Sequence, residues 1–202
     1  MAQVNVVDKE ILIKIVYYGP ALSGKTTNLE YVNKKISKAK ASELLSISTE
    51  GDRTLFFDFL PIQTNIVPDF NTKFQLYTVP GQVHYNATRR LVLQGVDGIV
   101  FVADSQWNKQ SANAESFDNM RQNLADFGIK LQDMPYVLQY NKRDLDNLSE
   151  IEAMEKLLNS VPNPVPSFQS VAIRGDGVFD TLNAICRICV KKLLHDIKPR
   201  KR

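Results

Sequence analysis

The sequence has few of the features that mark secreted, membrane-spanning or nucleic-acid-binding proteins. Its 202 residues include two cysteines and one tryptophan, and the net charge is +3. No apolar run approaches the ~20 residues of a membrane-spanning helix, and so small an excess of positive charge is not typical of a nucleic-acid-binding domain. With 44% hydrophobic residues, the chain is long enough to bury a core without disulfides or metals. We expect one soluble globular domain.

The two ends of the chain carry no strong targeting signal. Residues 1–10 lack a basic segment followed by an apolar one, and no glycine follows Met1. We therefore expect neither a signal peptide nor a myristoyl group, and a cytoplasmic protein without an integral membrane segment. The basic tail, residues 198–202, could make weak contact with an acidic membrane surface, although exposed terminal charge is usually only solvated.

The two cysteines fit a packing role better than a redox role. Cys186 and Cys189 are three residues apart in a helical pattern, so both thiols lie on one helix face. The same face carries the apolar residues Ile185, Ile188 and Leu193. A redox CxxC pair is expected after a strand, at the start of a helix. We predict two buried thiols.

Short apolar runs alternate with helical patterns along most of the chain. The runs rich in β-branched and aromatic residues, which predict strands, are residues 11–18, 54–62, 73–79, 98–104, 136–140 and 168–173. Helices are predicted over residues 25–38, shortly after Tyr85, and over 112–127, 149–159 and 177–197. This alternation predicts an α/β fold with a mainly parallel sheet covered on both faces. No clear helix separates the runs between Leu44 and Val79, so an antiparallel hairpin or edge strand is expected there.

A phosphate-binding loop is predicted where the first strand passes into the first helix. The segment GPALSGKT matches the pattern G-x-x-x-x-G-K-[ST] at Gly19, Gly24, Lys25 and Thr26. The glycines let successive N–H groups point inward, and this anion nest continues into the positive end of the helix. Lys25 would neutralise the β- and γ-phosphate oxygens, and the Thr26 hydroxyl would ligate Mg²⁺. The loop alone does not distinguish ATP from GTP.

The segment YNKRDL indicates which base is bound. It places Asn141, Lys142 and Asp144 at the end of a hydrophobic strand. The Asp144 carboxylate can accept hydrogen bonds from the ring N–H and the amino group of guanine, whereas the ring nitrogen of adenine would repel it. Asn141 would brace the loops, the Lys142 stem would cover one face of the base, and the Ala172 N–H would donate to the guanine carbonyl. Ligands bind beyond the carboxyl ends of such strands, so we expect one shared site.

With GPALSGKT, PGQ, NKRD and SVA in this order, the chain resembles the Ras-like small GTPases over nearly its whole length. The segments STEGDRTLFFDFLP, LYTVPGQ, DGIVFVADSQ and YNKRDL are more specifically similar to the bacterial MglA branch, the gliding-motility and cell-polarity switches. The resemblance implies a single Ras-like P-loop GTPase domain over residues 1–197. Its sheet would be mixed, mostly parallel and six-stranded, with five main helices on both faces and an extra strand near the switch region.

The same resemblance implies ligands and partners. GTP or GDP and Mg²⁺ would be bound, and the protein would be cytoplasmic with recruitment to a cell pole. A dimeric roadblock-domain (MglB-type) partner would accelerate hydrolysis, and polarity or motility effectors would bind in one nucleotide state.

The resemblance also gives roles to individual residues. Thr54 matches the switch threonine that closes on Mg²⁺ and the γ-phosphate, and Arg53 the arginine that this branch supplies from its own chain to stabilise the transition state. Gly81 matches the glycine whose N–H meets the γ-phosphate, and Gln82 the residue that orients the attacking water. Thr78 stands where most Ras-like proteins carry an acidic residue, so Mg²⁺ would be held mainly by hydroxyls, phosphates and water.

These inferences define three sets of residues. The catalytic set is Arg53, Thr54 and Gln82, and the metal ligands are Thr26 and Thr54. The phosphate-binding set is Gly19, Ala21, Leu22, Ser23, Gly24, Lys25, Thr26, Thr27 and Gly81. The guanine-binding set is Asn141, Lys142, Asp144 and Ala172.

Two features near the switch residues stay outside these sets. His84 follows Gln82 closely, but phosphoryl transfer depends on positioning and charge more than on proton abstraction, so no general-base role is assigned. The apolar run Leu55, Phe56, Phe57 and Phe59 fits either a partner surface or core packing.

Ala21 stands where Ras-like proteins usually carry glycine. Its methyl group is expected to crowd the transition state more than bound GTP, which predicts slow intrinsic hydrolysis with little loss of affinity. Two other functions remain open from the residues. The chain could be a hydrolysis-deficient nucleotide-binding scaffold that acts only as an interaction module, or a P-loop ATPase or kinase, which Asp144 disfavours.

Overall fold

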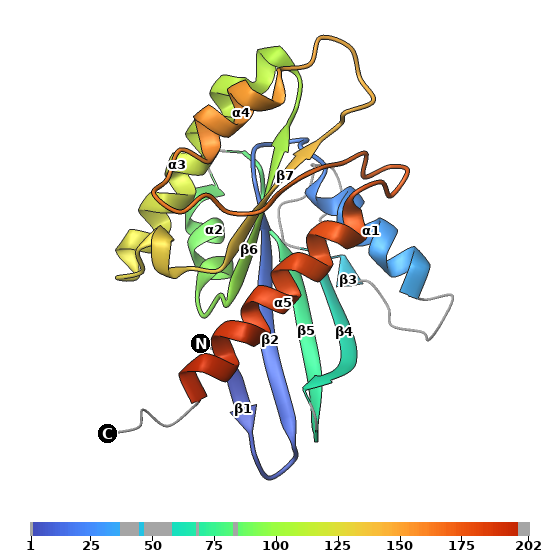
Figure 1. The fold of residues 1–202 in the computed structure, drawn as a ribbon, viewed down its shortest axis with the longest axis vertical. Helices are drawn as coiled ribbons and strands as arrows, with labels where there is room; N and C mark the ends of the chain where they lie inside the picture. Colours follow the sequence, from blue (N-terminus) through green and yellow to red (C-terminus); the bar gives the residue numbers. More distant parts are fainter. Residues whose placement is uncertain (1, 37–44, 47–57, 68, 83–84, 198–202) are drawn as a thin grey trace.

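The structure is a computed structural model that describes residues 2–36, 45–46, 58–67, 69–82 and 85–197. Eight strands and five α-helices lie in these residues (Figure 1). The strands are β1 (Gln3–Asn5), β2 (Glu10–Tyr18), β3 (Leu45–Ser46), β4 (Asp58–Val67), β5 (Phe70–Thr78), β6 (Gly98–Asp104), β7 (Tyr136–Asn141) and β8 (Ser167–Gln169). The helices are α1 (Lys25–Ile36), α2 (Asn86–Leu93), α3 (Gln110–Asp126), α4 (Ile151–Leu158) and α5 (Val178–Ile197). Two short 3₁₀ turns cover Trp107–Lys109 and Leu131–Asp133.

The strands form one sheet whose order is β3-β4-β5-β2-β6-β7-β8, with β1 paired to β2. β5, β2, β6, β7 and β8 are parallel, whereas β4 runs antiparallel to β5. The six longer strands of this order confirm the predicted six-stranded, mostly parallel mixed sheet, and β4 with β5 is the expected antiparallel hairpin. The short β3 extends the sheet beside β4, where the resemblance implied an extra strand. β1 adds a second short strand that was not expected.

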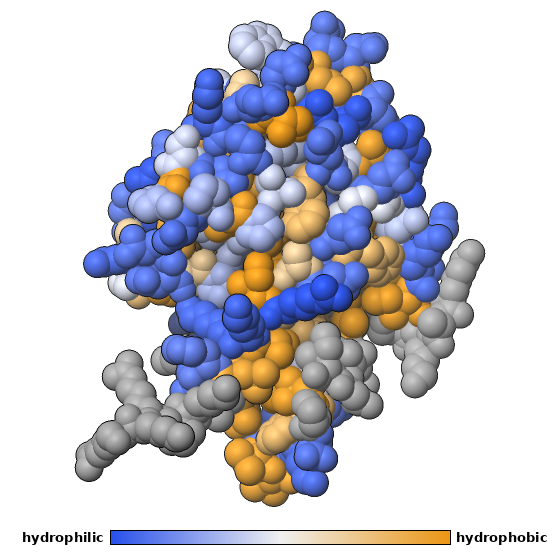
Figure 2. Space-filling model, viewed as in Figure 1, coloured by the Kyte–Doolittle hydropathy of each residue, from blue (hydrophilic) through white to orange (hydrophobic). Residues whose placement is uncertain are grey.

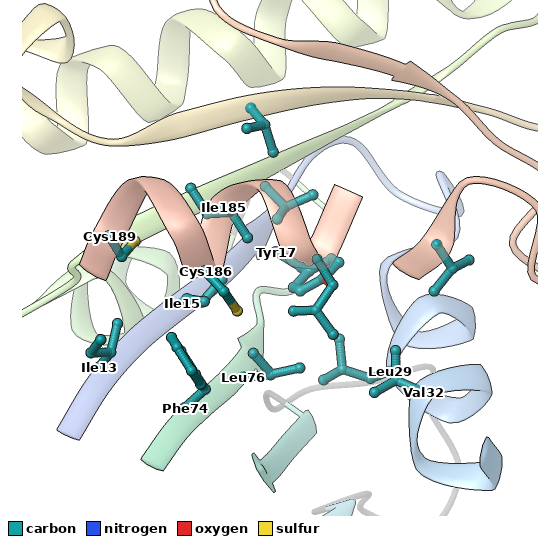
Figure 3. Close-up of a cluster of buried hydrophobic side chains, with 14 of the residues drawn as sticks. Ile13, Ile15, Tyr17, Leu29, Val32, Phe74, Leu76, Ile185, Cys186 and Cys189 are labelled. Carbon is teal, nitrogen blue, oxygen red and sulfur yellow. The ribbon is translucent and has the colours of Figure 1, made fainter. Parts of the chain in front are cut away.

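Two buried clusters cover the two faces of the sheet. α1 and α5 pack on one face, against side chains such as Ile13, Ile15 and Tyr17 of β2 and Phe74 and Leu76 of β5 (Figure 3). α2, α3 and α4 cover the other face, against the alternate side chains of β2, β6 and β7. Because successive strand residues point to opposite faces, β6, whose residues are all buried, reads as a nearly continuous apolar run.

The cysteines lie in the first of these clusters. Cys186 and Cys189 on α5 are 8% and 4% exposed, and both are free thiols, so the predicted packing role is confirmed. Burial raises the pKa of Cys186 to about 12, and it raises the pKa of Cys189 as well. A thiol with so high a pKa stays protonated and unreactive at neutral pH.

The end of the molecule opposite the predicted site carries an exposed apolar turn. Figure 2 shows hydrophobic surface at its lower end, where Figure 1 places the turn between β1 and β2. Val6 and Val7 in this turn are 71% and 92% exposed. The carboxyl ends of the parallel strands lie at the other end of the sheet, which is where the predicted nucleotide-binding motifs occur.

Most element boundaries agree with the sequence to within a few residues, but the last strand is shorter than predicted. β8 ends at Gln169 rather than continuing to Ile173. The backbone pairing with β7 continues to Ser170, whose N–H donates to the Tyr140 carbonyl at 2.9 Å. The next two N–H groups have other partners: that of Val171 donates to the Asp176 carbonyl at 3.0 Å, and that of Ala172 donates to the Asn141 Oδ1 at 2.9 Å.

Candidate functional site

The phosphate loop lies between the end of β2 and the start of α1, as predicted. Three of its residues have positive φ: Gly19 at 145°, Leu22 at 62° and Gly24 at 101°. Gly24 is required at its position twice over, because a Cβ there would also lie 2.1 Å from the Asn141 Nδ2. The Asn141 Nδ2 donates to the Ser23 carbonyl at 2.8 Å. A residue of the guanine motif therefore binds the backbone of the phosphate loop directly.

The Lys25 ammonium is folded into the loop. Lys25 is 6% exposed, and its Nζ donates to the carbonyls of Gly19 at 3.0 Å and Pro20 at 2.6 Å. The ammonium group therefore places a positive charge close to the N–H groups of the loop. This arrangement fits an anion bound at the loop.

A cavity of about 490 Å³ adjoins the loop. It brings together the phosphate loop and the segment that follows β5, and it is lined by Ala21, Leu22, Gly24, Lys25, Thr26, Thr27, Val79, Pro80, Gly81, Gln82 and Tyr85. Of the residues predicted to contact phosphate, seven therefore line a single cavity together with Gln82. The other two, Gly19 and Ser23, do not line it. The Gly19 carbonyl accepts from the Lys25 Nζ, and the Ser23 carbonyl accepts from the Asn141 Nδ2.

Gly81 and Ala21, which both line this cavity, are in close contact with each other. A Cβ placed on Gly81 would lie 2.3 Å from the Cα and 2.5 Å from the backbone nitrogen of Ala21. Only glycine allows so close an approach of two backbones. The segment that carries Gln82 is thus in contact with the position whose methyl group the sequence analysis singled out.

The guanine motif lies beyond β7, next to the phosphate loop. Lys142 adopts a positive φ of 67°, and its Nζ forms an ion pair with Asp104 Oδ2 at 2.7 Å. Asp104 ends β6 and is 1% exposed, so this pair fixes the Lys142 stem over the end of the sheet. Asp144, in contrast, is exposed, which leaves its carboxylate accessible to a ligand.

The Ala172 N–H has a partner within the protein. It donates to the Asn141 Oδ1 at 2.9 Å. The predicted bond from this N–H to the guanine carbonyl would therefore share or replace the bond to Asn141. Asn141 itself is 2% exposed, and it joins β7, the phosphate loop and the chain after β8 with one amide group. Its predicted role as a brace agrees with these contacts.

Several predicted residues lie outside the described part of the chain. They are Arg53, Thr54, Leu55, Phe56, Phe57, His84 and the basic tail at residues 198–202. Their roles stay predictions. Gln82 is described, and its carbonyl accepts from the Tyr85 N–H at 3.3 Å at the entry to α2.

The residues present suit a magnesium ion held largely by hydroxyls and phosphates. Thr26 lines the cavity beside Lys25. Within the described ranges, no group of three or more histidine, cysteine, aspartate or glutamate side chains could hold a metal ion. Mg²⁺ usually keeps several waters and binds nucleotides through few protein ligands, so the Thr26 hydroxyl fits the ion that the family usually uses.

Sequence reasoning missed four residues that support the site. Asn28 of α1 and Gln139 of β7 exchange two side-chain hydrogen bonds of 2.9 and 3.0 Å in the interior, which fixes the start of α1 to the sheet. Asp104 orients Lys142, and Arg89 of α2 is buried behind Gly81. A polar residue inside or directly after an apolar run was the available signal for Gln139 and Asp104. Arg89 gave no such signal.

This fold and this loop define the class of protein, a Ras-like P-loop small GTPase. Proteins of this class bind guanine nucleotides. The sequence model described as the ADP-ribosylation factor family matches residues 1–189. The chain belongs to that family. It is also similar to the mutual gliding-motility protein MglA of Myxococcus xanthus (strain DK1622), with 53% identity over 193 residues, covering 96% of this chain and 98% of the relative. The resemblance to the MglA branch is therefore confirmed.

The structure also bears on the membrane prediction. Among the helices in the described ranges, none is both long and apolar enough to span a bilayer.

Proposed function

We propose that this protein is a GTP-binding switch that hydrolyses GTP slowly on its own and controls bacterial cell polarity or motility through nucleotide-dependent partner binding. The observation that carries the proposal is the convergence of the phosphate loop, the Gly81–Gln82 segment and the NKRD motif at one edge of the sheet in a Ras-like family member. The family supplies the class of reaction, and the name of the relative from Myxococcus xanthus supplies the process, gliding motility.

GTP would lie across this edge with its phosphates in the loop and its base at the guanine motif. Lys25 and the loop N–H groups would hold the β- and γ-phosphates, and Thr26 with Thr54 would hold Mg²⁺, which offsets the phosphate charge when bound. Asp144 would select guanine by accepting its ring N–H and amino group. Its exposure in the structure is what such a role requires.

The switch would work through contacts that exist only while the third phosphate is present. Thr54 and the Gly81 N–H would bind the γ-phosphate, and hydrolysis would release both segments. Gln82 would orient the attacking water, and Arg53 would offset charge on the transferred phosphoryl group, a contribution worth ~10³ or more in rate. A stable shift between two states needs several kcal/mol of differential binding, which these contacts plus Mg²⁺ can supply.

Ala21 would slow the reaction without weakening binding. Its backbone lies against Gly81, so its methyl group lies near the space that Gln82 and Arg53 must enter. Crowding there acts on the transition state more than on bound GTP. The switch would therefore favour its GTP form until a partner accelerates hydrolysis, and the partner class implied by the resemblance is a roadblock-domain (MglB-type) dimer. Effectors at a cell pole would bind in one nucleotide state.

One experiment tests the proposal in two stages. The nucleotide content of the purified protein is determined after denaturation by chromatography, and phosphate release from GTP is then measured with and without the roadblock-domain partner. We expect bound guanine nucleotide, slow release alone and faster release with the partner. The Gln82→Ala variant should bind GTP but lose the partner-stimulated rate.

The same experiment separates the alternatives. If the protein bound GTP but released no phosphate above background with the partner present, the scaffold function would replace the enzyme. If it bound ATP in preference to GTP, a P-loop ATPase or kinase would replace both.

A further inference from the structure

Arg89 of α2 lies in the interior, directly behind the segment that carries Gly81. Its side chain is 1% exposed. The Nε donates to the Pro80 carbonyl at 2.9 Å, and one terminal nitrogen donates to the Gly81 carbonyl at 2.7 Å. The other terminal nitrogen donates to Asn119 Oδ1 at 2.7 Å. One guanidinium thus joins two consecutive backbone carbonyls to helix α3.

The guanidinium of Arg89 is also linked to β2. The ring of Tyr18, the last residue of β2, lies 5.4 Å from the Arg89 Cζ. The Tyr18 hydroxyl donates to Asn119 Oδ1 at 2.6 Å, and Asn123 Nδ2 donates to the same hydroxyl at 3.2 Å. β2 leads directly into the phosphate loop, so Arg89 connects the two sides of the cavity through fixed parts of the fold.

The burial of the Arg89 guanidinium is unfavourable for the stability of the fold by itself. A buried guanidinium is stabilised best by a carboxylate, but the three described hydrogen bonds of Arg89 all go to neutral oxygens. A buried charge without an opposite charge costs more than a well-packed apolar residue at the same place. A positional role for the guanidinium explains why such a group lies here.

The geometry of the peptide bond shows what Arg89 positions. No cis peptide bond occurs in the described residues, and in a planar trans peptide the carbonyl and the N–H point in opposite directions. The Pro80 carbonyl belongs to the same peptide as the Gly81 N–H. Because Arg89 holds that carbonyl on one side, the Gly81 N–H points away from Arg89. The Gly81 carbonyl likewise fixes the plane that carries the N–H of Gln82.

We propose that Arg89 is a positioning residue that presents the Gly81 N–H to the γ-phosphate and sets the backbone orientation of Gln82. The inference rests on the proposed GTP-switch function. Arg89 touches neither the nucleotide nor the attacking water, so it acts only through these two peptides. GDP lacks the group that the Gly81 N–H meets, and the contribution of Arg89 therefore belongs to the triphosphate state.

The test compares the affinity for GDP with that for a non-hydrolysable GTP analogue, GppNHp, in four proteins. Arg89→Lys keeps the charge, but one ammonium cannot reproduce the planar fork that spans both carbonyls and Asn119. We expect its GppNHp affinity to fall about tenfold, the scale of one lost hydrogen bond to a charged group, with GDP affinity nearly unchanged. Arg90→Lys is the matched control, since Arg90 is the next residue of α2, is exposed and pairs with Asp126. It should alter neither affinity.

Asn119→Ala is the fourth protein and guards against misfolding of Arg89→Lys. It removes the anchor of the guanidinium while Arg89 remains, and it should shift the GppNHp-to-GDP affinity ratio in the same direction by a smaller factor. If the role of Arg89 were purely structural, both variants would lose GppNHp and GDP affinity together and the ratio would stay unchanged. That result would overturn the inference but not the proposed function, because the wild-type protein would still bind both nucleotides. A wild-type protein that bound neither nucleotide would remove the proposed function, and this inference with it.

Discussion

Gly81 is in backbone contact with Ala21: a Cβ on Gly81 would lie 2.3 Å from the Ala21 Cα and 2.8 Å from the Pro20 carbonyl carbon. The contact joins the loop that follows β2 to the segment that follows β5. These two strands are neighbours in the parallel sheet, so their carboxyl ends bring the two segments together. The hydrolytic geometry of the proposed switch depends on how closely these segments approach.

Replacing Gly81 with alanine should disrupt this contact. Contacts below 3.0 Å with backbone atoms cannot be relieved by a side-chain rotation, so one of the two segments must move. We expect a loss of about 1–3 kcal/mol in the free energy of unfolding, the usual cost of overpacking. GTP affinity should fall more than GDP affinity, because Gly81 is proposed to meet the γ-phosphate. Thermal denaturation and nucleotide titration measure the two effects, and unchanged values for both would contradict the close approach.

Replacing Ala21 with glycine should raise GTP turnover several-fold while leaving GTP affinity nearly unchanged. Removing the methyl group opens the space beside Gly81 that Gln82 and Arg53 must enter, and this space matters in the transition state. Ala21→Val should lower turnover further, which makes the three proteins a graded series. Single-turnover phosphate release measures the rates. Equal rates with alanine and glycine would show that the methyl group is accommodated.

Replacing Asp144 with asparagine should change which base is bound. The amide can donate a hydrogen bond where the carboxylate only accepts, so it fits the carbonyl of xanthine better than the amino group of guanine. We expect GDP affinity to fall by about 1.5–3 kcal/mol, the range for a hydrogen bond to a charged group, and affinity for xanthosine diphosphate to rise. Asp146→Asn makes the same charge change at an exposed neighbour and should leave GDP binding intact. A matching loss in the Asp146 variant would point to a general charge effect.

The two thiols should resist labelling in the native protein. Burial raises the pKa of Cys186 to about 12, so raising the pH from 7 to 9 produces almost no thiolate in the folded state. In the unfolded chain the same thiols titrate near ~8.5, and labelling should then accelerate over that pH range. Reaction with a disulfide reagent, with and without guanidinium chloride, measures the difference. Rapid stoichiometric reaction of the native protein would show that α5 opens from the sheet.

Much of the fold follows from local patterns. The β2 run and the α5 pattern are long and strongly periodic, so their extents agree with the structure to within a residue. The end of β8 was predicted wrongly, because beyond Ser170 the backbone N–H groups bind elsewhere: that of Val171 to the Asp176 carbonyl and that of Ala172 to the Asn141 side chain. Asn141 lies on another strand, so the local sequence gives no sign of that competition.

The class of the protein and the chemistry of its loops can be predicted from the sequence alone. The phosphate loop and the guanine motif are contiguous segments, and their chemistry depends on residue types at short, fixed spacings. Which of these segments touch depends on the three-dimensional packing of the chain. The approach of Gly81 to Ala21, the ion pair of Lys142 with Asp104 and the burial of Arg89 behind Gly81 all join residues from different strands and helices. Such contacts arise only when the sheet sets its strands side by side, because sequence spacing carries no information about which strand ends become neighbours.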